Sequence, residues 1–137
     1  MNYDWSRHWL DQAKALSMMS KCPRGKVGAF IIDQNNSPVS AGLNGPPRKS
    51  SGELCGDHEC YRDSLNVKSG TRIEVGCHHA EQNAICNAAK KGVSLNNTTM
   101  IISTFPCLLC AKLIHHSGIS AIIVPIDSFY SREGIDY

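Results

Sequence analysis

Apolar residues near the start of the chain recur at the spacing of an α-helix. Intervals of three or four residues separate Trp5, Trp9, Ala13 and Leu16. This spacing predicts an amphipathic helix over residues about 4–20, with its apolar face against a sheet. We expect both tryptophans to belong to the core.

Two apolar runs then predict a β-hairpin. The first helix ends in a segment with proline and glycine at 22–26, and a continuous apolar run follows at 27–32. Turn-forming residues occupy 33–36, and a second strand returns over 38–43.

The second half of the chain alternates helical and strand patterns. Small apolar residues at helical spacing follow His79, and Gly92 ends that element. The pattern then predicts a strand, a helix and a buried strand at 100–104, 106–116 and 121–126. This order of elements is that of an α/β sandwich, and we expect its later strands to be parallel.

Length and composition indicate one globular domain. The 137 residues are enough for a single domain over 1–137 with a core of its own, and 42% apolar with 19% charged residues is an ordinary balance. A long, polar, irregular insert occupies about 46–76. Such a segment is usually functional or held by a local cross-link.

Charge and hydropathy exclude several classes of protein. A formal charge of +2 without a basic stripe argues against a nucleic-acid partner, and no apolar run reaches the length of a membrane span. Residues 1–5 lack the features of a signal peptide, so we expect a cytoplasmic location, in a cell or a virus-infected cell. Seven cysteines therefore indicate metal binding and free thiols before disulfides.

Two short motifs carry the candidate chemistry. His79 and Glu81 form an H-x-E, and Pro106, Cys107 and Cys110 form a P-C-x-x-C. Together these match the signature of zinc-dependent nucleobase deaminases. In that signature His79, Cys107 and Cys110 would bind zinc, and Glu81 would carry protons. Zinc with three protein ligands keeps one position for water and lowers the pKa of that water to about 7.

The spacing of these residues suits that division of roles. Cys107 and Cys110 share one helical turn, and Pro106 suits the first helical position. His79 and Glu81 stand two apart, so both reach one site only from the start of a helix. We therefore expect two helix N-termini to converge on one metal, where their dipoles favour thiolate.

Other interpretations of the same residues remain open. In one alternative, Cys107 and Cys110 are a buried pair beside an unrelated histidine. In another, they are a thioredoxin-like redox pair, which leaves His79 and Glu81 without a role. A metalloprotease is excluded because H-E-x-x-H is absent.

The chain resembles the deoxycytidylate (dCMP) deaminase family over nearly its whole length. The resemblance is carried by Ser20–Cys22, Val27–Ala29, Gly42–Pro46, His79–Ile85, Phe105–Lys112 and Ser117–Ile119. The two metal motifs are shared with tRNA adenosine, cytosine and guanine deaminases. The G-x-N-G segment and the cysteine-bearing insert are what point to dCMP.

The resemblance implies both a fold and a reaction. The fold is the cytidine deaminase-like three-layer α/β/α sandwich, with a mixed sheet of four to five strands, usually in a homo-hexamer. The reaction is hydrolysis of dCMP to dUMP and ammonia in pyrimidine deoxynucleotide metabolism. Activated water attacks C4, and Glu81 moves protons to N3 and to the leaving amine. Activation by dCTP and inhibition by dTTP, with Mg²⁺, are the expected regulation.

The resemblance also implies contacts to the nucleotide. We expect substrate contacts from Asn44, Ala80 and Tyr130. We expect contacts to the 5′-phosphate or to an effector phosphate from Arg24, Lys26, Gly42 and Gly45. The alternatives are a turn-forming role for Asn44 and the glycines, ordinary packing for Tyr130, and solvation for the two cations.

The remaining cysteines are enough for a second, structural zinc. The proposed ligands are Cys22, Cys55, Cys60 and Cys77, with His58 and His78 as substitutes. Some bacterial and phage members of the family carry such a site, and a metal would hold an insert that cannot bury a core of its own. The alternative is scattered free thiols. We expect Cys86 to lie in the core.

Two other functions compete with this one. A tRNA adenosine deaminase would use the same chemistry, but the charge of +2 argues against an RNA substrate. A non-catalytic, zinc-stabilised nucleotide-binding module would have no use for Glu81 as a proton carrier.

Overall fold

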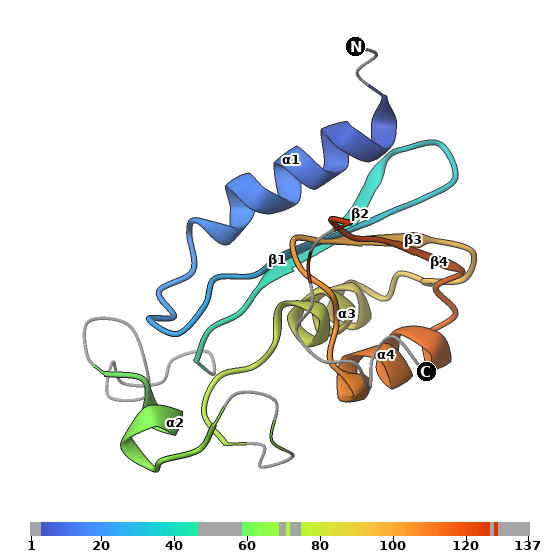
Figure 1. Cartoon of the computed structure of the whole chain (residues 1–137). Helices are drawn as coiled ribbons and strands as arrows, with labels where there is room; N and C mark the ends of the chain where they lie inside the picture. The colour runs from blue at the N-terminus through green and yellow to red at the C-terminus, as the bar shows by residue number, and fades with distance from the viewer. Residues whose placement is uncertain (1–3, 47–58, 69–70, 72–74, 127, 129–137) are drawn as a thin grey trace.

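The computed structural model describes residues 4–46, 59–68, 71, 75–126 and 128. Its elements, labelled in Figure 1, are α1 (Trp5–Ser17), β1 (Gly28–Ile32), β2 (Pro38–Leu43), α2 (Tyr61–Ser64), α3 (Ala80–Lys91), β3 (Thr99–Ile102), α4 (Leu108–His116) and β4 (Ala121–Ile123). Within this described part of the chain, no helix combines the length and apolar character needed to cross a membrane.

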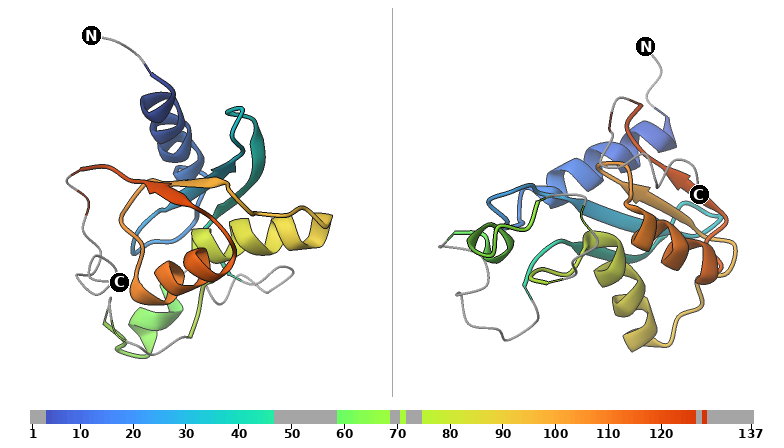
Figure 2. Two further views of the ribbon diagram at one scale, coloured as in Figure 1. Left: turned by 90° about the vertical axis from the view of Figure 1, so that its right-hand side faces the viewer. Right: turned by 60° about the horizontal axis from the view of Figure 1, so that its bottom comes forward.

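The strands form one mixed sheet in the order β2-β1-β3-β4. The central strand β1 pairs antiparallel with both β2 and β3, whereas β3 and β4 are parallel. Helix α1 covers one face of the sheet, and α3 and α4 cover the other (Figures 1 and 2). The predicted α/β sandwich with a mixed sheet of four to five strands is therefore confirmed, with four strands among the described residues.

Helix α1 packs on the sheet through one apolar stripe. Trp9 and Ala13 are buried in one cluster with Ile32 of β1 and Ile101 of β3. The prediction for Trp5 was wrong: this residue is 57% exposed, and its ring contacts His8 edge-on instead of the sheet. Trp5 opens the first turn of the helix, one turn beyond the stripe that reaches the core. The helix also ends at Ser17, earlier than the pattern predicted.

Helix α3 lies unusually close to β2 because of Gly42. A Cβ at this position would stand 2.5 Å from the backbone oxygen of Ala80 and 2.5 Å from the backbone nitrogen of Ala84. Any side chain here would push the helix away from the strand. The hydroxyl of Ser40 donates to the carbonyl of Ala84 at 2.7 Å and adds a second tie between the same elements.

Two asparagines fix how far α3 is displaced along β2. The side-chain amides of Asn83 and Asn87 donate to the carbonyls of Leu43 and Ala41, both at 2.8 Å. Residues four apart on a helix rise about 6 Å, and residues two apart on a strand about 7 Å, so the two spacings match. Strand β2 lies at the edge of the sheet and pairs with β1 on one side only. The two amides therefore also donate to carbonyls that have no partner strand on the other side.

We expect Gly42→Ala to destabilise the protein by about 1–3 kcal/mol, because its methyl group would overlap the backbone of α3. Urea unfolding followed by circular dichroism would measure the loss. The matched control is Gly45→Ala, whose methyl group meets no described atom within 4 Å. Equal stability of the two variants would contradict the close approach.

Candidate active site and metal centre

The first turns of α3 and α4 meet at one place. His79 is the N-cap of α3, and Cys107 is the N-cap of α4, both in extended conformation. Cys110 lies in the first turn of α4, where it is buried. The two helix starts therefore converge, as the motif spacing predicts. Pro106 precedes the cap instead of occupying the first helical position, because Cys107 has extended dihedral angles and stands outside the helix.

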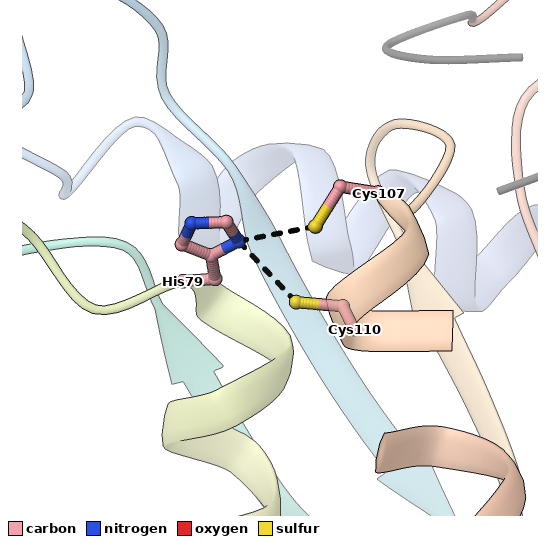
Figure 3. A group of neighbouring side chains, drawn as sticks. All are labelled: His79, Cys107 and Cys110. Atoms are coloured by element: carbon pink, nitrogen blue, oxygen red, sulfur yellow. Dashed lines mark hydrogen bonds between the residues drawn. The ribbon is translucent and has the colours of Figure 1, made fainter. Parts of the chain in front are cut away.

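Three metal-binding side chains face one another across this junction. The Nδ1 atom of His79 lies 3.6 Å from Cys107 Sγ and 3.3 Å from Cys110 Sγ (Figure 3). With ordinary Zn–N and Zn–S bond lengths, a tetrahedral zinc places nitrogen and sulfur ligands about 3.6 Å apart. The donor types and their separations thus fit a zinc ion held by His79, Cys107 and Cys110.

The backbone around His79 is held on both sides. The side-chain carbonyl of Gln82 accepts a hydrogen bond from the backbone N–H of His79 at 2.8 Å. On the other side, His78 and Gly45 exchange two backbone hydrogen bonds, at 2.8 and 3.1 Å. These bonds fix the backbone from which the imidazole projects.

Glu81 lies in the first turn of α3 and is only 4% exposed. Burial raises its pKa above the ordinary value, and a hydrogen bond with the Cys110 side chain opposes this. Because burial is the largest cause, the protonated carboxyl is favoured compared with a carboxyl in water. A group in this state is suited to hold and release a proton.

A hydrogen bond between their side chains couples the pKa values of the two cysteines. The hydrogen bond from Cys110 lowers the pKa of Cys107 to about 4. The same hydrogen bond, together with burial, raises the pKa of Cys110. Because zinc binds thiolates, binding of the metal would release the proton that Cys110 holds.

A cavity of about 430 Å³ opens over this junction. His79, Glu81 and Cys107 line it together with the aromatic residues Tyr61 and Phe105. Among the described lining residues Glu81 is the one carboxylate, and three cations join it: Arg24, Lys26 and Arg62. The cavity therefore combines a buried acid with a positively charged wall.

The sequence did not single out Arg62, Tyr61, Thr104 or Phe105 as lining residues. Arg62 and Tyr61 belong to the short helix α2 inside the insert, where no motif marks them. Thr104 and Phe105 follow β3 and immediately precede the P-C-x-x-C motif. Their position between the end of a strand and a metal-binding motif is the sequence feature that could have identified them as lining residues.

Asn44 has a clear structural role. Its amide oxygen accepts the Val27 amide at 2.9 Å, and its amide nitrogen donates to the Gly25 carbonyl at 2.7 Å. The side chain thus ties the loop before β1 to the end of β2. It also lines the cavity beside Ala80. Contacts from Asn44 and Ala80 to a substrate stay predictions, and Tyr130 lies outside the described residues.

The four predicted phosphate contacts differ in their surroundings. Arg24 forms an ion pair with Asp63 at the cavity wall, whereas Lys26 is exposed there. Gly42 is buried under α3, and the backbone of Gly45 is paired with His78. Since both glycines are engaged elsewhere, we leave them out of the phosphate site proposed below.

The predicted second zinc site is only partly described. Cys22, Cys60, Cys77 and His78 all line the cavity. In the described ranges, however, the close group of metal-binding side chains consists of His79, Cys107 and Cys110. Cys55 and His58 lie outside the described residues, so the second zinc stays a prediction.

The prediction that Cys86 lies in the core was wrong, because this residue is exposed on α3. The helix buries its other side, which carries Ala80, Ala84 and Ala88. Position 86 therefore faces away from the sheet.

Comparison with known proteins supports the zinc-binding interpretation. The family model "Cytidine and deoxycytidylate deaminase zinc-binding region" matches residues 3–126. A deoxycytidylate deaminase of Mus musculus is 33% identical over 130 residues, covering 95% of this chain and 69% of that protein. A probable deoxycytidylate deaminase of Drosophila melanogaster is 36% identical over 129 residues, covering 91% of this chain and 63% of that protein. The chain thus spans about two thirds of these two relatives.

A phage protein and a solved structure match over more of their own length. A deoxycytidylate deaminase of Mycobacterium phage D29 is 31% identical over 134 residues, covering 91% of this chain and 97% of that protein. The crystal structure of dCMP deaminase from the cyanophage S-TIM5, in complex with dCMP and dUMP, has a TM-score of 0.78 at 25% identity. That match covers 99% of this chain and 90% of the cyanophage chain.

We expect Cys107→Ser and Cys110→Ser each to lower bound zinc well below one ion per chain, because each removes a thiolate ligand. Metal analysis of the dialysed proteins would measure this. Cys86→Ser is the control, since Cys86 is exposed on α3 away from the junction. Full zinc content in both motif variants would contradict the assigned ligands.

Proposed function

The chain belongs to the cytidine and deoxycytidylate deaminase family, and on that basis we propose that it hydrolyses dCMP to dUMP and ammonia. The observation that carries the proposal is the position of Glu81. This buried acid lies beside three zinc-binding side chains and lines a cavity with a cationic wall. A purely structural metal site has no need of such an acid.

His79, Cys107 and Cys110 would hold the zinc ion. When bound in such a site, zinc makes a water molecule acidic enough to act as a nucleophile at neutral pH. The helix starts at His79 and Cys107 direct their positive dipole ends toward the negative charge that develops there. Cys110 and Glu81 are buried at this junction, whereas His79 and Cys107 are partly exposed and line the cavity.

Glu81 would carry the protons of the reaction. Its carboxylate takes a proton from the attacking water and gives it to N3 of the cytosine ring. It then takes the second proton and passes it to the amine at C4. The C4–O bond forms, the C4–N bond breaks, and ammonia leaves, so that dCMP and water become dUMP and ammonia. The raised pKa of Glu81 suits these repeated transfers at neutral pH.

The cationic wall supports a nucleotide substrate over a nucleoside. Arg24, Lys26 and Arg62 line the same cavity as Glu81. Guanidinium and ammonium groups bind phosphate through charge-assisted hydrogen bonds. Asn44 and Ala80 also line the cavity, where they would contact the sugar and the base.

The remaining parts of the proposal rest on the family resemblance. They are regulation by dCTP and dTTP with Mg²⁺, a second zinc at the insert, and a homo-hexamer that acts in pyrimidine deoxynucleotide metabolism. Light scattering with and without dCTP would test the assembly, and a monomer under both conditions would contradict it.

Substrate choice is tested by ammonia release from the zinc-loaded protein. The panel is dCMP, CMP, deoxycytidine, cytosine and a tRNA anticodon stem, each with and without dCTP. We expect turnover confined to dCMP. Deoxycytidine and cytosine have no phosphate to pair with the cationic wall, and the preference over CMP rests on the family resemblance. Turnover of the RNA or the free base instead would retain the zinc chemistry and overturn the proposed substrate.

We expect Glu81→Gln to keep its zinc and to lose at least about 100-fold in kcat, because the amide has the shape of the acid but cannot carry the proton. Metal analysis and steady-state kinetics on the same preparation separate the two effects. Near-normal turnover in this variant would rule out the proton-carrier role. Loss of zinc would instead make Glu81 a ligand.

A further inference from the structure

Asp63 holds Arg24 at the wall of the cavity. The Nε atom of Arg24 donates to Asp63 Oδ1 at 3.0 Å, and Nη2 contacts the same oxygen. The Nη2 group also donates to the carbonyl of Val67. The two partners lie 39 residues apart in sequence. The ion pair therefore joins the segment before β1 to α2, and both segments line the cavity over Glu81.

This ion pair is easily displaced. The side chain of Asp63 is 49% exposed and that of Arg24 is 21% exposed, so water screens the attraction. Both guanidinium contacts go to a single carboxylate oxygen instead of the two parallel bonds of a bidentate pair. Helix α2 is a single turn with no buried residue, so the helix itself does little to fix Asp63 in place.

A phosphate monoester is a stronger partner for Arg24 than Asp63 is. It carries close to two negative charges and three acceptor oxygens, against one charge on a carboxylate. Two other cations belong to the same wall: Arg62 donates to the Val75 carbonyl and the Thr71 hydroxyl, and Lys26 is exposed. Asp63 is the carboxylate that the structure pairs with Arg24, so a phosphate that binds Arg24 at this position has to displace it.

We propose that Arg24 exchanges Asp63 for the 5′-phosphate when the nucleotide binds, which makes Asp63 a specificity-determining residue. The inference rests on the proposed function and deepens it. A nucleotide gains Arg24 at the expense of the Asp63 contact, whereas a nucleoside has no anion to offer and leaves the ion pair closed. The strength of the Arg24–Asp63 pair therefore sets how much the phosphate adds to binding.

The test compares dCMP, measured as a substrate, with deoxycytidine, measured as an inhibitor of dCMP turnover, in three variants of the zinc-loaded protein. Asp63→Asn removes the competing charge, so we expect KM for dCMP and the inhibition constant of dUMP to fall about two- to fivefold, with kcat unchanged. Arg24→Gln removes the phosphate partner, so both constants should rise. Glu59→Gln is the control, because Glu59 is exposed and gives the same charge change four residues before Asp63.

The opposite direction of the two changes is what separates exchange from a structural clamp. If the pair only held α2 in place, both variants would weaken binding of dCMP. Each variant would then weaken binding of deoxycytidine to the same extent. Either of these results, or no effect of Asp63→Asn, overturns the proposal. Thermal unfolding checks that each variant is folded, and Asp63→Ser replaces Asp63→Asn if the latter is not.

The wild-type result distinguishes failure of the inference from failure of the proposed function. If the wild type deaminates dCMP but Asp63→Asn behaves identically, only the exchange of partners is wrong. If the wild type deaminates neither dCMP nor deoxycytidine, the proposed function fails and the inference falls with it.

Discussion

The close packing of α3 on β2 is the constraint on which the site depends. Gly42 allows the two backbones to approach, and Asn83 and Asn87 fix the helix at one position along the strand. Because His79 caps this helix and Glu81 lies in its first turn, the same contacts place both residues relative to the sheet. A slip of the helix by one residue would rotate its face and move Glu81 away from the cavity.

The second half of the metal centre comes from the parallel part of the sheet. Strand β3 runs toward the start of α4, so the chain delivers Cys107 and Cys110 beside the start of α3. Two helix starts at one point gather four groups of three kinds in a small space: an imidazole, two thiols and a buried acid. Each is held by backbone geometry, which reduces the cost of organising the site when metal and substrate bind.

The acid and the cations of the cavity lie at different depths. Glu81 is buried at the metal junction, and Arg24 and Lys26 lie in more exposed parts of the wall. In the proposed function, a nucleotide would place its base toward the acid and its phosphate toward the cations. The insert contributes to the wall through Arg62 and Tyr61, although it contributes little to the described core.

The sequence by itself determined the metal chemistry and, apart from the short helix α2 in the insert, the order of the elements. Periodicity placed the helices and strands because burial of one face imposes a period on the residues, and His79, Glu81, Cys107 and Cys110 were identified because their chemistry restricts both residue type and spacing. Only the tertiary structure decided that Cys86 is exposed, that Gly42 packs under α3, and that Arg62 faces the cavity. The pairing of Arg24 with Asp63 was equally inaccessible, since nothing local marks two residues 39 positions apart as neighbours. Such contacts depend on which surfaces the whole fold brings together, and a local pattern does not contain that information.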